Sequence, residues 1–395
     1  MKKLFAFLAS ALILCSCGQK PQNAGAENPA EVVINDPYSG MSGALGSIIR
    51  FDRFSEYSDI PVSVVCCDYS ETVLKILAED SDIDIYFLNP SDARKLIESG
   101  IYEPIISETI ERHNESCFDY LKDFCVVDGK TVLTPIMSSV TAILVPNEAT
   151  EDMPDISCID SYLNWVRSCS GERKAYTRGD DLYTFLNYQY EKYYCDFKSR
   201  TFDYDTEIYR HIYSELLSGS ERYSNPPETV VGFESAGAKN LAEQKDLLAA
   251  EGGFWEFADC AEGFRAFPIP KISEKVGGNF VNAIFAYINP YGKNKETAVK
   301  VLETIAENYS DLTDDGIYEI FNYPFIKKDR EDYGEKYSPE SRLFGDFYAI
   351  AKNGFVHDYQ LLSARNDIDL YQSGKISLDE AIEMYAREVG AWLNE

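Results

Sequence analysis

The sequence predicts an α/β protein made of two lobes, and three observations support this prediction. Strand and helix patterns alternate along residues 31–104. The chain from residue 31 to residue 395 is longer than one hydrophobic core comfortably serves. An almost unbroken apolar run over residues 131–146 is too long for an ordinary strand. The alternation predicts a wound sheet, and the other two observations predict that the chain passes from one lobe into another.

The first lobe is predicted from a series of strands and helices. Apolar and β-branched runs predict strands at residues 32–34, 61–67 and 83–88. Helical spacing of apolar residues predicts helices between them, at residues 42–56 and 71–79. The next helix is well marked, because Asn89 can cap it and Pro90 fits its first turn. Asp92 complements the helix dipole, and Gly100 ends the helix. Such a series predicts a parallel, doubly wound sheet.

The apolar run predicts how the chain leaves the first lobe. Pro135 and the pair Ser138–Ser139 interrupt residues 131–146, so we expect two strands joined by a hinge that enters the second lobe. A second crossing is expected at residues 281–288. The other expected elements are helices at residues 159–169, 182–194, 206–217 and 378–393, and strands at residues 174–177, 228–233 and 264–269.

The first 17 residues carry an export signal. Lys2 and Lys3 precede an apolar run over residues 4–14, which is too short to span about 30 Å of hydrocarbon and predicts a signal peptide over residues 1–16. The ending Leu-Cys-Ser-Cys resembles the lipobox of bacterial lipoproteins. Cys17 is the better candidate for acylation, because Cys15 follows a bulky leucine. The alternative is an ordinary secretory signal with incidental cysteines.

The segment that follows Cys17 predicts a tether. Residues 18–30 are polar and rich in Gly, Pro, Asn and Gln, without apolar periodicity. Cys17 and these residues together form the expected lipid anchor and flexible tether, residues 17–30. We therefore expect the protein at the extracytoplasmic face of a bacterial cell membrane, held there by lipid alone.

The charge balance restricts the partners. Asp and Glu number 66 against 37 Lys and Arg, which gives a net charge of −29. This excess repels nucleic acid and anionic lipid headgroups, so no nucleic-acid partner is expected. It mildly favours neutral or cationic ligands.

The cysteines after Cys17 allow two interpretations. They are Cys66, Cys67, Cys117, Cys125, Cys158, Cys169, Cys195 and Cys260, and none has CxxC or Cys/His metal-ligand spacing. An oxidising location would permit disulfides such as Cys117–Cys125 or Cys158–Cys169. Buried thiols are an equally common use of cysteine, so both alternatives stay open.

Polar and aromatic residues follow each of the first three predicted strands. Residues 35–43, Asp68 and Asn89 lie directly after the strands, and ligands of wound parallel sheets bind beyond these carboxyl ends. Tyr38 and Ser39 in the first segment are candidates for ligand contact. The alternative for each position is a residue that caps a helix or forms a turn.

Four separated segments carry a resemblance to a known family. They are residues 83–105 (IDIYFLNPSDARKLIESGIYEPI), residues 129–147, residues 196–217 (DFKSRTFDYDTEIYRHIYSELL) and residues 267–306, followed by the closing helix SGKISLDEAIEMYAREVGAWLNE. In this order they resemble the family 1 extracellular solute-binding proteins of ABC importers, which include the maltodextrin- and other sugar-binding proteins. The resemblance implies a periplasmic-binding-protein-like fold, in which each lobe is a sheet flanked by helices. Crossings join the lobes, and the ligand cleft lies between them.

The resemblance also implies lobe boundaries and a ligand site. Residues 31–137 and 285–325 would form lobe 1, and residues 138–284 and 326–395 would form lobe 2. The family's contact regions fall here on Tyr38, Ser39, Asp68, Asn89, Ser138, Ser139, Arg178, Asp181, Tyr183, Phe233, Asn282 and Tyr287. Trp255 is the one plausible tryptophan platform for a sugar, because Trp165 and Trp392 have the spacing of core residues.

The expected function follows from the resemblance. It implies a non-catalytic, monomeric protein without cofactor or metal, which captures a small polar solute and delivers it to the permease subunits of an ABC importer. An oligosaccharide is the preferred solute, ahead of a peptide or a polyamine. A ligand-sensing lipoprotein that signals to a membrane receptor is the alternative from another class.

The sequence gives less support to two other interpretations, an enzyme and a calcium-binding loop. A secreted glycan hydrolase needs reactive groups, yet the three histidines are isolated and neither HExxH nor GxSxG occurs. Residues 369–380 have calcium-loop spacing at positions 1, 6 and 12, but Tyr371 occupies position 3, where an oxygen ligand is needed. We instead expect Gly374 to end one helix and Ser377 with Glu380 to cap the next.

Overall fold

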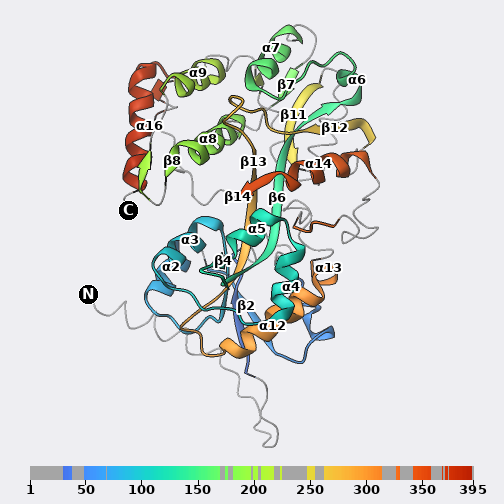
Figure 1. The fold of residues 1–395 in the computed structure, drawn as a ribbon, viewed down its shortest axis with the longest axis vertical. Coiled ribbons are helices and arrows are strands. Elements are labelled where there is room, and N and C mark those ends of the chain that lie inside the picture. Colours follow the sequence, from blue (N-terminus) through green and yellow to red (C-terminus); the bar gives the residue numbers. More distant parts are fainter. Residues whose placement is uncertain are drawn as a thin grey trace, which may run out of the picture.

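The computed structural model describes residues 30–37, 49–67, 69–169, 174–176, 181–196, 199–202, 206–217, 223–224, 247–253, 262–313, 326–329, 341–356, 367, 370–371 and 373–393. Over these ranges the fold is mixed α/β. Ten strands form one curled sheet, and twelve α-helices pack around it (Figure 1). The strand order is β10-β7-β11-β6-β13-β3-β1-β2, with β12 on the edge of β6 and β14 on the edge of β13.

The predicted strand–helix series is present at one end of the sheet. β1 (Val32–Asn35) pairs in parallel with β2 (Val62–Val65) on one side and β3 (Ile85–Leu88) on the other. The connecting helices are α2 (Tyr69–Leu77) between β2 and β3, and α3 (Pro90–Glu98) after β3. The parallel arrangement is therefore confirmed for these three strands. Of the helix expected at residues 42–56, the described part holds only the 3-10 turn η2 (Phe54–Glu56).

The sheet as a whole is mixed, so the prediction of a parallel sheet is wrong where β13 and β6 join it. β13 (Asn279–Ile288) runs antiparallel to β3, with Phe285 opposite Leu88. It also runs antiparallel to β6 (Leu133–Pro146). The alternating pattern of residues 31–104 could not show this, because β13 enters the sheet from nearly 200 residues further along the chain.

The apolar run forms one strand rather than the two strands expected. β6 is 14 residues long, and Pro135 and Ser138–Ser139 lie within it. Met137 pairs with Ile284 while Pro135 pairs with Phe285, so Ile136 is the extra residue of a β-bulge. The bulge accommodates the proline without ending the strand, because an extra residue lets the ladder skip a missing N–H.

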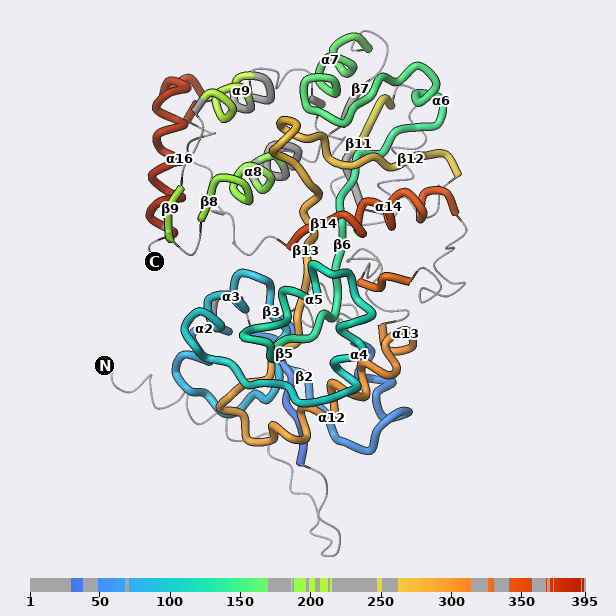
Figure 2. The backbone as a smooth tube through the Cα atoms, viewed as in Figure 1, coloured from blue at the N-terminus to red at the C-terminus, as the bar shows by residue number. Residues whose placement is uncertain are grey.

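β6 and β13 are the two long, paired strands at the centre of the sheet. Figure 2 shows the two strands side by side through the centre of the molecule. Beyond β13, the second half of β6 pairs with β11 (Leu247–Gly253) and with β12 (Phe264–Phe267), both antiparallel. β7 (Lys174–Tyr176) and β10 (Tyr223–Ser224) extend the sheet past β11. β14 (Gly354–Val356) pairs in parallel with the start of β13.

The helices gather at the two ends of the sheet (Figure 1). Near β7 and β11 lie α6 (Asn147–Thr150), α7 (Ile159–Cys169), α8 (Asp181–Tyr194), α9 (Thr206–Leu217) and α16 (Leu378–Trp392). Near β1 and β3 lie α2, α3, α4 (Glu108–Ser116), α5 (Asp119–Phe124), α12 (Lys295–Glu307) and α13 (Tyr309–Leu312). α14 (Arg342–Lys352) crosses beside β12.

Most of the remaining sequence predictions hold within about two residues. They are confirmed for α7, α8, α9, α16, β7 and β12, whereas the strand expected at residues 228–233 lies outside the described residues. Two small hairpins complete the described secondary structure: β4 (Val126–Val127) with β5 (Lys130–Thr131), and β8 (Cys195–Asp196) with β9 (Thr201–Phe202).

Three clusters of buried side chains form the core. One packs β1 and β3 against α12 and includes Ile85 and Val301. A second packs α7, α8 and α16 together through large aromatics, of which Tyr162 and Tyr385 are examples. The third, which includes Phe285, follows β6 and β13 between the other two. Burial of these apolar surfaces is the main force that holds the helices on the sheet.

The carboxyl-terminal helix begins as the sequence predicts. The Ser377 hydroxyl accepts from the Glu380 N–H while the Glu380 carboxylate accepts from the Ser377 N–H, which is a capping box. Gly374 has a φ of 69°, and its N–H donates to the Tyr371 carbonyl, so it ends the preceding turn. Asp369, the first position of the calcium alternative, lies outside the described residues.

Cysteine, metal and membrane features can be stated for the described ranges. The seven cysteines within them form no disulfide, and Cys117 and Cys125 are fully buried. In these ranges no group of His, Cys, Asp or Glu side chains is arranged to hold a metal ion. The helices of the same ranges include none that combines the length and apolar character needed to cross a bilayer.

Candidate functional site

A pair of polar side chains lies at the middle of the sheet, where β6 and β13 run together. Ser139 and Asn282 are register partners across the two strands, so their side chains lie on the same face. Asn282 is exposed, although nearly every other residue of β13 is buried. Ser139 is 8 % exposed. Sequence reasoning identified both residues, and the structure brings them together.

Two aromatic rings stand beside this pair. Phe280 lies two residues before Asn282 and therefore on the same face of β13. Its ring centroid is 4.4 Å from that of Tyr188 on α8. The sequence analysis missed both residues as site candidates; the period-two spacing of Phe280 and Asn282 is the signal that links them. We call Ser139, Asn282, Phe280 and Tyr188 the mid-sheet patch.

Two other candidates have structural roles. Ser138 is fully buried on the face of β6 opposite Ser139, because successive strand residues alternate between faces. Tyr287 is fully buried near β3, and its hydroxyl donates to the carbonyl of Ile101 at 2.9 Å. Burial raises the pKa of the Tyr287 hydroxyl above its usual value. Neither side chain belongs to the mid-sheet patch.

Asn89 caps α3, as the alternative reading of this residue expected. Its side-chain oxygen accepts from the Asp92 N–H at 2.9 Å, and its amide donates to the Asp92 carboxylate at 2.8 Å. Burial raises the pKa of Asp92. At the end of β1, the side chain of Asn35 is committed in the same way, because it donates to Thr72 and accepts from the Cys67 N–H.

The structure places the other candidates only in part. Asp181 and Tyr183 belong to the first turn of α8. The candidates outside the described residues are Cys17, Tyr38, Ser39, Asp68, Arg178, Phe233 and Trp255. Of the three strand ends that were expected to converge, the described part includes Asn89 and residues 35–37, whereas Asp68 and residues 38–43 lie outside it.

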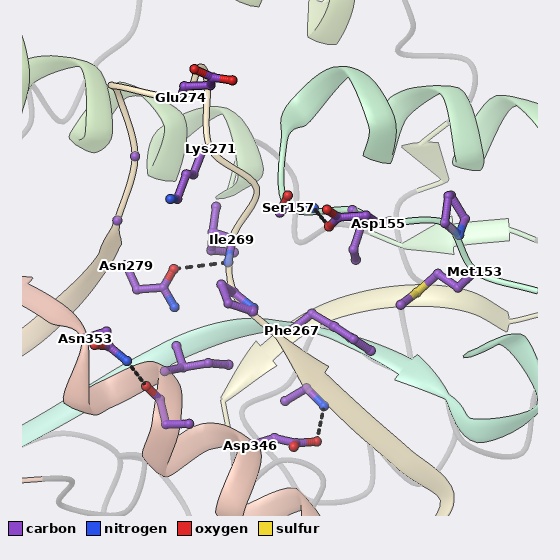
Figure 3. Close-up of a pocket in the computed structure, with 18 of the residues that line it drawn as sticks. Met153, Asp155, Ser157, Phe267, Ile269, Lys271, Glu274, Asn279, Asp346 and Asn353 are labelled. Atoms are coloured by element: carbon purple, nitrogen blue, oxygen red, sulfur yellow. Dashed lines mark hydrogen bonds between the residues drawn. The ribbon is translucent and has the colours of Figure 1, made fainter. Parts of the chain in front are cut away.

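A pocket of about 820 Å³ lies beside α7 and α14 (Figure 3). Its walls come from residues 153–157, the segment 266–279 and one face of α14. The sequence analysis did not find this pocket, because its three walls are separated by up to 200 residues and no local pattern joins them. A smaller pocket of about 490 Å³ lies at the other end of the molecule, between α4 and residues 306–311.

His113 and Lys327 line the smaller pocket. The Lys327 ammonium donates to Nδ1 of His113 at 3.1 Å, and Nε2 of His113 lies 3.2 Å from the Pro135 carbonyl. Burial, assisted by the Lys327 charge, lowers the pKa of His113 to about 3. The imidazole is therefore neutral at ordinary pH, with its proton on Nε2.

Comparison with known proteins gives no relative: no family model matches the chain, and no curated protein is significantly similar to it.

Proposed function

We propose that the chain is an extracytoplasmic solute-binding lipoprotein of an ABC importer, anchored through Cys17. It captures a small polar solute, for which an oligosaccharide is the first candidate, and delivers it to the permease. The observation that carries the proposal is the mid-sheet patch. An exposed amide and a hydroxyl beside two aromatic rings match what a sugar needs, since hydroxyl groups hydrogen-bond and the apolar face of the ring stacks.

The proposal divides the molecule into two lobes at β6 and β13, and the mid-sheet patch belongs to lobe 2, next to the boundary. Lobe 1 comprises residues 31–137 and 285–325, and lobe 2 comprises residues 138–284 and 326–395. Of the last range, residues 326–328 contact α4 and the start of α5 in lobe 1. The bulge supports this division, because the register shift between Met137–Ile284 and Pro135–Phe285 falls at these boundaries. A bulge interrupts the hydrogen-bonded ladder and lets a strand bend, so β6 and β13 can serve as the hinge.

The mechanism we propose is a shift of population between open and closed forms. A solute that contacts both lobes gains its full set of contacts only in the closed form, and its binding therefore favours closure. The permease then recognises the closed form. Because the ligand groups contact solute without reacting with it, the protein needs no catalytic residue for this task.

The proposal predicts that Asn282→Ala weakens sugar binding about three- to tenfold, because one hydrogen bond of about 0.5–1.5 kcal/mol is lost. Ser139→Ala is expected to have a smaller effect in the same direction. The measurement is calorimetric titration of the full-length chain in detergent with a panel of mono- and oligosaccharides. The matched control is Asn164→Ala, an exposed asparagine on α7 away from the patch.

Other results would overturn defined parts of the proposal. Unchanged sugar affinity in Asn282→Ala would remove the mid-sheet patch from the site. Binding of peptides or polyamines in place of sugars would overturn the assignment of an oligosaccharide as the solute. Turnover of a bound glycan would replace the transport function with hydrolysis.

A further inference from the structure

The 820 Å³ pocket has rigidly held walls. Gln189 of α8 is 1 % exposed, and its amide nitrogen donates to the carbonyls of Pro270 and Gly278 at 3.1 and 3.0 Å. Its oxygen accepts from the Ile272 N–H. One buried side chain thus holds the loop 270–278 at its two ends and at Ile272, two residues after its start. Because this loop forms one wall of the pocket, the pocket is built before any ligand arrives.

A second set of bonds attaches the same loop to the start of α7. The Lys271 N–H donates to the Ser157 carbonyl at 2.9 Å, and the Ile159 N–H donates to the Lys271 carbonyl at 2.8 Å. The Lys271 side chain packs on Gly277, where a Cβ atom would come within 2.4 Å of it. Lys271 therefore has a fixed stem on the pocket wall, as Figure 3 shows.

Asn279 presents an unused hydrogen-bond donor to this pocket. The residue is 4 % exposed and lines the pocket (Figure 3). Its side-chain oxygen accepts from the Ile269 N–H at 3.2 Å, which fixes the orientation of the amide. Within the described part of the chain, the amide nitrogen has no hydrogen-bond partner. A buried donor without an acceptor is costly and uncommon, so this nitrogen indicates a ligand that supplies an acceptor.

Lysines give the pocket a cationic character that the whole chain lacks. Lys192, Lys271 and Lys275 line it. The Lys192 ammonium lies 3.8 Å from the centre of the Phe355 ring, close to Gly278. In a protein with a net charge of −29, three lysines at one pocket attract an anion locally.

The acidic residues of the pocket wall offset these lysines only in part. Asp346 is engaged by Arg265 through a bidentate ion pair of 2.5 and 2.9 Å. Asp155 accepts a hydrogen bond from the Ser157 N–H. The carboxylates of Asp155 and Glu274 are two negative charges at the pocket, against the positive charges of the three lysines. The balance at the pocket is therefore positive, and the Asp155 and Glu274 carboxylates can accept from hydroxyl groups of a ligand.

We propose that this pocket is a second binding site, which takes a small organic carboxylate. The ligand carboxylate accepts from the Asn279 amide and from a lysine ammonium, and its apolar body packs on Met153, Phe267 and Ile350. Asn279 and Asn282 are three residues apart on β13 and so point to opposite faces, which separates the carboxylate position from the mid-sheet patch. The two sites are neighbours, because Lys192 lies one turn of α8 from Tyr188 of the patch. The second site goes beyond the proposed function and does not depend on it.

The test titrates 4-phenylbutyrate and its neutral amide, 4-phenylbutyramide, into the full-length chain by calorimetry. We expect the carboxylate to bind and the amide to bind at least about tenfold more weakly, since it lacks the charge. Asn279→Asp keeps the acceptor for Ile269 but removes the donor and adds a negative charge. Lys271→Met keeps the stem on Gly277 but removes the ammonium. Each is expected to weaken carboxylate binding about tenfold or more.

The control is Lys300→Met, an exposed lysine on α12 at the other end of the molecule, which should leave the affinity unchanged. Absence of carboxylate binding at millimolar concentration would overturn the proposal. Equal binding of the acid and the amide would also overturn it, as would wild-type affinity in both pocket variants. Sugar affinity measured on the same variants keeps this result separate from the mid-sheet patch.

Discussion

Asp84→Ala is expected to lower the free energy of unfolding by about 3–5 kcal/mol, the largest effect that we expect from one substitution. Asp84 is 2 % exposed and directly precedes β3. Its carboxyl oxygens accept from the Val33 N–H at 3.0 Å and from the Asn294 N–H at 2.9 Å. Removing the carboxyl group leaves partly buried donors of β1 and of the α12 cap without their acceptor. Urea unfolding followed by circular dichroism measures the change.

Asp82→Ala is the matched control for this experiment. Asp82 lies two residues earlier and pairs with Lys293 at 2.7 Å, but its side chain is 79 % exposed. An exposed ion pair contributes little to stability, so this variant should unfold nearly as the wild type does. Equal unfolding midpoints for the two variants would show that the Asp84 bonds do not hold β1 to α12.

Acidification is expected to destabilise the protein through His113. The pKa of His113 is about 3 in the folded protein and near 6.5 when the chain is unfolded. Only the unfolded state therefore takes up this proton as pH falls from 6.5 towards 3, and stability is lost over that window. Between pH 7.5 and pH 4.5 the wild type should lose about 2–3 kcal/mol more than His113→Gln. Urea unfolding at a series of pH values measures the difference.

The comparison with His113→Gln isolates this one group, because carboxylates titrate in the same window in both proteins. Gln can still donate to the Pro135 carbonyl, which His113 contacts at 3.2 Å. His211→Gln is the control, since His211 is exposed beside Asp160 on the opposite end of the molecule. Parallel pH profiles for the wild type and His113→Gln would contradict the burial of a neutral imidazole.

Sequence reasoning predicted elements well where the signal was local. Asn89, Pro90 and Gly100 delimit α3 in the structure as they do in the sequence, and the Ser377–Glu380 capping box opens α16. Each of these signals comes from residues close together in the chain, whose backbone geometry is dictated by their own side chains. Ser139 and Asn282 were each identified as candidates from the sequence, but their pairing joins two distant strands and is visible only in the structure.

Features that depend on distant pairing could not be predicted in this way. The apolar run looked like two strands because Pro135 and two serines interrupt it, and the bulge that keeps β6 continuous is visible only against β13. The 820 Å³ pocket is invisible in the sequence for the same reason, since Gln189 organises a loop that begins 81 residues later. The Lys327–His113 contact spans 214 residues.

The most direct test of the account is whether solute binding brings the two ends of the sheet together. Donor and acceptor dyes attached through ketone amino acids at the exposed positions of Asn164 on α7 and Lys300 on α12 report the distance between these ends. The account predicts that a saturating oligosaccharide raises the energy-transfer efficiency, and that Asn282→Ala shifts this rise to higher sugar concentration. A sugar that binds without changing the efficiency would contradict closure about β6 and β13.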